Sequence, residues 1–110
     1  MQRIYRLKSN GAFHYIYKKG ERVKGKNLVL YFAKSNKGLK AGFSVSKHVG
    51  NSVTRNRVKR HLRENFRLLL NDIDHGYSFV VVAGEKTADM NHYQIGDELK
   101  FVLKKANLIK

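Results

Sequence analysis

The chain has 110 residues, 42% of them apolar and including six Phe and six Tyr, which is enough for one folded domain and too few for two. It contains no Cys, which excludes a disulfide framework and a zinc site built on thiolates. No apolar run approaches the roughly 20 residues that span a membrane, and the N-terminus lacks the apolar core of a signal peptide. We therefore expect one domain over residues 1–110 and a cytoplasmic location.

The net charge of +15 is distributed unevenly along the chain. Of the 23 Lys and Arg residues, 17 precede Glu64, together with one of the 8 acidic residues. Such self-repulsion destabilises a compact state, so an anionic partner is the simplest explanation. No helix combines large apolar anchors with a basic face that is free of core packing, so a nucleic acid fits better than a membrane.

Residues 9–20 predict the first helix, with Ser9 or Asn10 as its N-cap. Phe13 and Tyr17 lie one helical turn apart and form an aromatic pair. Core packing is the ordinary role of such a pair. The alternative is that part of the pair lines a groove and stacks on unpaired bases.

Residues 23–34 predict a strand with apolar residues on both faces, followed by a turn at 35–38 and a returning strand at 39–46. One side of the returning strand is small and polar: Gly42, Ser44 and Ser46. If that side lies beside Tyr31, the sheet has little bulk there, which suits the floor of a groove for an extended ligand.

Residues 51–71 predict a strongly basic helix, capped by Asn51 or Ser52. One stripe of the helix is apolar and predicts core packing: Val58, Leu62, Phe66 and Leu69. The opposite side carries cations and one amide: Asn56, Arg57, Lys59, Arg60, Arg63 and Arg67. A solvated helix face usually mixes charge signs and this one barely does, so we interpret it as a nucleic-acid contact.

The remaining segments complete a small α+β domain. Residues 77–83 predict a central strand, 84–90 a loop, and Asn91 the cap of a last helix. Helices packed against one small mixed sheet are the expected architecture.

The segment Phe43–Lys47, followed by Gly50-Asn51 and the run Arg55–Glu64 with its Arg-Asn-Arg start, resembles the protein subunit of bacterial ribonuclease P. The resemblance covers most of the chain and weakens after about Gly84. It implies an α-β-β-β-α-β-α sandwich, similar to a domain of a small-subunit ribosomal protein, with a left-handed crossover through the basic helix.

The resemblance also implies a function. Ribonuclease P is an endoribonuclease that removes the 5′ leader of precursor tRNA, and its catalyst is an RNA that uses Mg²⁺. The protein subunit binds this RNA, holds the single-stranded leader in a cleft between the first helix and the sheet, and broadens substrate specificity. The isolated chain is then expected to be inactive.

The resemblance assigns residues to two RNA surfaces. The leader cleft is lined by Phe13, Tyr17, Tyr31, Ser44, Ser46 and Lys47. The surface facing the catalytic RNA consists of Arg55, Asn56, Arg57, Lys59, Arg60 and Arg63. Glu64 is expected to pair with a neighbouring cation and to be structural.

The residues themselves do not indicate a protein-only enzyme. None of the five His has metal-ligand spacing with another, and the N-terminal half lacks the carboxylates that hold Mg²⁺, so we expect no dedicated metal site in the protein. His48 beside Lys47 leaves the alternative of a metal-free ribonuclease. A structural ribosomal protein is the other alternative.

Overall fold

The computed structural model describes residues 5–109. Its helices and strands run in the order α1 (Asn10–Lys19), β1 (Glu21–Lys24), β2 (Leu28–Lys34), β3 (Lys40–Val45), α2 (Ser52–Leu69), β4 (Tyr77–Ala83) and α3 (His92–Lys105). Two short 3-10 helices, η2 (Lys47–Val49) and η3 (Glu85–Asp89), flank α2 and β4. The predicted α-β-β-β-α-β-α order is therefore confirmed.

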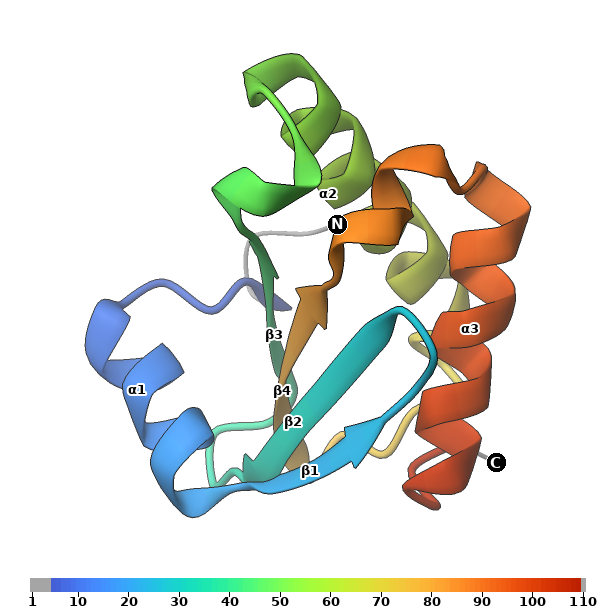
Figure 1. Ribbon diagram of the computed structural model, residues 1–110. Helices are drawn as coiled ribbons and strands as arrows, with labels where there is room; N and C mark the ends of the chain where they lie inside the picture. Colours follow the sequence, from blue (N-terminus) through green and yellow to red (C-terminus); the bar gives the residue numbers. More distant parts are fainter. Residues whose placement is uncertain (1–4, 110) are drawn as a thin grey trace.

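The strands form one mixed sheet in the order β1-β2-β4-β3 (Figure 1). Strand β2 is antiparallel to both β1 and β4, whereas β3 is parallel to β4. Helix α2 makes the crossover between the parallel pair β3 and β4. Because β4 has partners on both sides, the prediction of a central strand at 77–83 is confirmed.

Three local predictions are wrong. Residues 23–34 form two antiparallel strands, because the chain turns at residues 25–27, where the Gly25 amide donates to the Leu28 carbonyl. The carboxylate of Glu98 on α3 accepts from the backbone amides of Asn27 and Leu28 and fixes this turn. Strand β3 does not return beside β2, since β4 lies between them. The expected loop at 84–90 contains η3.

Helices α2 and α3 cover one face of the sheet, and α1 lies against the other (Figure 1). The predicted apolar stripe of α2 is buried at Val58, Leu62 and Phe66. The Phe66 ring makes edge contacts with Phe43 and Phe79 at centroid distances of 5.7 Å each. The main core therefore lies between the sheet and the helix pair α2 and α3.

A side chain caps the N-terminus of each of the helices α1, α2 and α3. Ser9 accepts a hydrogen bond from the Ala12 amide, and Asn51 accepts one from the Thr54 amide, so Asn51 caps the basic helix. Asn91 forms a reciprocal capping box with Gln94. Among residues 5–109, no helix is both long and apolar enough to cross a membrane.

Candidate nucleic-acid interface

On the face of the sheet beneath α1, Tyr31 and the small residues of β3 are arranged differently from the side-by-side placement that the sequence suggested. The register places Tyr31, Val80 and Gly42 side by side across three strands, and Val29, Val82 and Ser44 in the next row. The small residues of β3 thus share a face with Tyr31. However, β4 inserts two valines between them, because β3 and β2 are not neighbours.

Tyr17 and Tyr31 connect α1 to this face. Their rings meet edge to face, with centroids 4.9 Å apart and an interplanar angle of 88°. Tyr17 remains 39% exposed, so one ring is accessible to a ligand while the pair holds its orientation.

Phe13 lies one turn before Tyr17 and packs directly over Gly42. A Cβ atom at position 42 would lie 2.4 Å from Cζ of Phe13, so any side chain there would push the Phe13 ring out of its place. Glycine at position 42 therefore leaves the space that the Phe13 ring occupies. The Phe13 side chain is half-buried and keeps part of its surface open.

A hollow of about 270 Å³ opens beside Phe13, between α1, β3 and α2. Most of its polar lining comes from one flank of α2, where Asn56, Lys59 and Arg63 recur at helical spacing. The structure thus brings a residue predicted for the leader cleft next to three predicted for the RNA-facing helix. We call this space the Phe13 hollow.

Two residues of the Phe13 hollow were not singled out as site residues by the sequence. Arg6 and Leu7 line it because the segment before α1 runs alongside β3, where the Leu7 amide donates to the Ala41 carbonyl at 3.0 Å. No local motif marks this pairing, which joins residues far apart in the chain.

The other predicted residues of α2 lie outside the hollow. Arg60 is exposed on the outer side of the helix. Arg57 donates to the Ala88 carbonyl at 2.7 Å and so ties α2 to η3. Arg55 is half-buried, and its Nε has no hydrogen-bond partner among residues 5–109.

The remaining predicted cleft residues spread beyond β3. Ser44 is half-buried on the same face as Gly42. Ser46 and Lys47 are exposed at the start of η2, and neither lines the Phe13 hollow.

The opposite flank of α2 faces α3 and is chemically different. Burial lowers the pKa of His61, and electrostatic interactions with the neighbouring His92 and Arg60 lower it further, against an opposing effect of Glu64. The lowered pKa favours the neutral imidazole of His61. Glu64, expected to pair with a cation, lies 3.8 Å from Nδ1 of His92.

Comparison with known proteins identifies a family. The family model described as Ribonuclease P matches residues 1–107. The chain is 42% identical to the ribonuclease P protein component of Staphylococcus haemolyticus, covering 98% of this chain and 95% of the relative. It is also 42% identical to the corresponding Clostridium botulinum protein, with coverages of 96% and 90%.

Solved structures agree with this match. The Staphylococcus aureus ribonuclease P protein superimposes with a TM-score of 0.89 at 38% identity, covering 96% of this chain and 98% of that one. A mutant of that protein with defective mRNA degradation activity gives the same TM-score and identity, with coverages of 96% and 90%. The Thermotoga maritima protein gives 0.84 at 27% identity, with coverages of 91% and 98%.

Proposed function

The chain belongs to the family of ribonuclease P protein components, and we propose how it divides two RNA contacts between its surfaces. Membership of this family makes it a subunit of a tRNA-processing ribonuclease. The outer side of helix α2 binds the catalytic RNA. The face beneath α1 binds the single-stranded 5′ leader of precursor tRNA. The protein thereby assists endonucleolytic removal of the leader and broadens the range of substrates.

The Phe13 hollow is the observation that carries this proposal. An unpaired base can stack on the open part of the Phe13 ring, and its flanking phosphates can reach Lys59 and Arg63 in the same space. Stacking without hydrogen bonds to base edges tolerates any sequence, which suits leaders that differ between tRNAs. The Tyr17–Tyr31 pair extends the aromatic surface along α1.

The outer side of α2 supplies the second contact. Arg60 offers an exposed guanidinium, and such groups form paired hydrogen bonds with phosphate. The Nε of Arg55, which lacks a partner in the described chain, is a further donor that an RNA oxygen would satisfy. These donors provide affinity through phosphate contacts, with the release of counterions.

The chemistry itself is assigned to the RNA partner, which uses Mg²⁺. The protein half that faces RNA carries 17 basic residues against one acid before Glu64, and hard cations require oxygen ligands. A basic surface instead screens phosphate repulsion between catalytic RNA and substrate. The family assignment favours this role over a structural ribosomal protein.

Reconstitution tests the proposal. The RNA that co-purifies with the chain is sequenced, transcribed and assayed on precursor tRNA with and without protein. The expected result is no cleavage by protein alone and a lower Mg²⁺ requirement when protein is added to the RNA. Cleavage of precursor tRNA by RNA-free protein, or an unchanged Mg²⁺ requirement, contradicts the proposal.

A second activity has support from one relative. The mutant S. aureus protein defective in mRNA degradation is 38% identical to this chain, so we include mRNA cleavage by protein alone as a second candidate. His48 is exposed in η2 and is the available general base. If RNA-free protein degrades mRNA and His48→Ala does not, this activity exists beside tRNA processing.

A further inference from the structure

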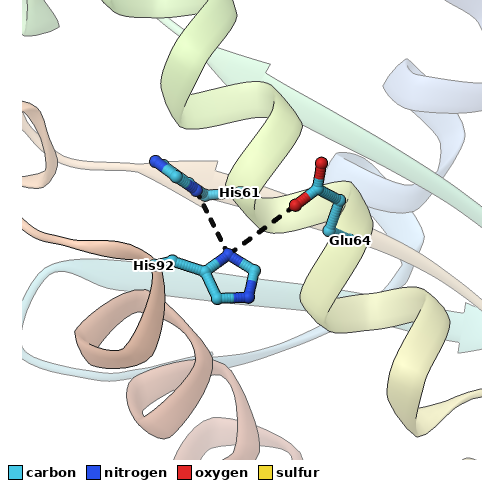
Figure 2. Close-up of side chains that lie close together, drawn as sticks. All are labelled: His61, Glu64 and His92. Carbon is cyan, nitrogen blue, oxygen red and sulfur yellow. Dashed lines mark hydrogen bonds and ion pairs between the residues drawn. The ribbon is translucent and has the colours of Figure 1, made fainter.

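We propose that His61, Glu64 and His92 form a binding site for a divalent transition-metal ion, with Zn²⁺ as its representative, between α2 and α3. Figure 2 shows the three side chains converging, with Nδ1 of His92 between the other two. Nδ1 of His92 lies 3.2 Å from Nδ1 of His61 and 3.8 Å from Oε2 of Glu64. One ligand atom from each residue lies within 4.8 Å of the others.

The separation of the two imidazole nitrogens is close to that of two ligands in a zinc site. Zinc binds imidazole nitrogen and carboxylate oxygen at about 2.0–2.2 Å, so two ligands of a tetrahedral ion lie roughly 3.3–3.5 Å apart. At 3.2 Å, the Nδ1 atoms of His61 and His92 lie close to this spacing. Glu64 is exposed, so its side chain has room to move toward an ion. Three protein ligands leave the fourth position for water.

A buried amide holds both histidines in place. The side-chain Nδ2 of Asn65 donates to the backbone carbonyl of His61 at 2.9 Å and to that of His92 at 3.0 Å. Asn65 is 9% exposed, and Gly96 lets α3 approach its Oδ1 closely. One side chain therefore fixes the relative position of the two backbones that carry the ligands, which pre-organises the site.

The donor set selects the kind of metal. Two nitrogens and one oxygen suit Zn²⁺ and its transition-metal neighbours, whereas Mg²⁺ and Ca²⁺ require oxygen ligands. Arg57 and Arg60 stand near His61, and their positive charges disfavour an ion held by charge alone. Binding must therefore come from coordination by the imidazoles.

The alternative is a hydrogen bond between two imidazoles. A distance of 3.2 Å between ring nitrogens also fits one Nδ1–H donating to the other Nδ1, with Glu64 solvated. The two possibilities differ in their response to added metal. Metal binding would hold α3 against α2 and raise the melting temperature progressively, with the logarithm of the metal concentration once the site is saturated.

The sequence could not reveal this site. His61 and Glu64 stand three residues apart on one helix, but His92 lies far along the chain and only the packing of α3 on α2 brings it near. The site lies on the flank of α2 that faces α3, away from the Phe13 hollow. The proposal therefore stands or falls independently of the proposed function.

Calorimetry with untagged, chelator-treated protein tests the site, with ZnCl₂ as the probe and MgCl₂ as a second arm. The expected result is one Zn²⁺ per chain, unaffected by Mg²⁺. His61→Ala and His92→Ala should each weaken Zn²⁺ binding by more than the 10- to 100-fold typical of losing an outer-shell partner. His14→Ala removes an exposed His on α1 and should leave binding unchanged.

Two further measurements keep the result interpretable. Co²⁺ should give the visible absorption of a tetrahedral site in the wild type and lose it in His92→Ala. Glu64→Gln keeps the side-chain shape and should weaken binding while circular dichroism remains native. The proposal is overturned if the wild type binds Zn²⁺ no more tightly than His61→Ala and His92→Ala do, or if His14→Ala removes the binding.

Discussion

The two faces of the sheet are built from the same four strands, yet one is closed and the other open. On the closed face, Leu30, Phe79 and Val81 are fully buried beneath α2 and α3. On the open face, Tyr31, Val82 and Ser44 remain partly accessible, because α1 is a helix of 10 residues and covers only part of it. Alternation along each strand thus separates the folding core from the surface that we propose for the leader.

The largest expected effect tests the closed face. Phe79→Ala removes a fully buried ring that packs against Phe66, and it should lower the free energy of unfolding by about 3–5 kcal/mol. Urea denaturation measures this loss. Phe101→Ala is the matched control on an exposed part of α3 and should stay within about 0.5 kcal/mol of the wild type. Equal losses would mean that the closed face is not the main core.

The second prediction concerns the turn that α3 holds on this closed side. Glu98→Ala removes the carboxylate that accepts from the Asn27 and Leu28 amides, and it should cost about 1.5–3 kcal/mol of stability. Hydrogen exchange should accelerate at these two amides. Asp97→Ala, at the neighbouring exposed position, should change neither quantity. Slow exchange retained at both amides in Glu98→Ala would contradict this assignment.

The sequence predicted the closed face better than the open one. Apolar periodicity located Val58, Leu62 and Phe66, because burial repeats with the helical turn and is visible locally. Which residues are neighbours on the open face depends on strand order, and no local sequence pattern indicates that β4 lies between β2 and β3.

The turn at residues 25–27 escaped prediction for a related reason. It is fixed by Glu98, which stands 71 residues from Asn27, so the turn depends on a contact that has no local signal. The Phe13 hollow is a similar case. Phe13, Lys59 and Arg63 were singled out individually as aromatic or cationic residues, whereas their meeting across α1, β3 and α2 follows from tertiary packing.

The third prediction tests the open face as a ligand surface. Stacking on an unpaired base is worth about 1–3 kcal/mol, so Phe13→Ala should weaken binding of leader-bearing precursor tRNA by roughly 5- to 150-fold. It should leave mature tRNA and the catalytic RNA nearly unaffected. Binding titrations on the three RNAs measure these effects.

A matched variant and a melting curve accompany this experiment. Tyr15→Ala removes an exposed aromatic from the same helix without touching the Phe13 hollow, and it should bind all three RNAs normally. Phe13 also packs on Gly42, so the melting curve separates lost stacking from lost folding. If folded Phe13→Ala keeps the wild-type ratio between leader-bearing and mature tRNA, the leader assignment is wrong.

The smallest expected effect, on the salt dependence of RNA binding, distinguishes the exposed side of α2 from that of α3. Arg60 on α2 and Lys100 on α3 are both exposed cations, but α2 carries six Lys and Arg residues against one acid, whereas α3 carries three against two. A phosphate contact contributes about 0.7–0.9 to the slope of log K against log salt, so Arg60→Ala should reduce that slope by nearly one unit. Lys100→Ala should leave it unchanged, because a merely solvated charge releases no counterions on binding. Salt titrations of the protein–RNA complex measure both slopes, and equal slopes in Arg60→Ala and the wild type would show that Arg60 is only solvated.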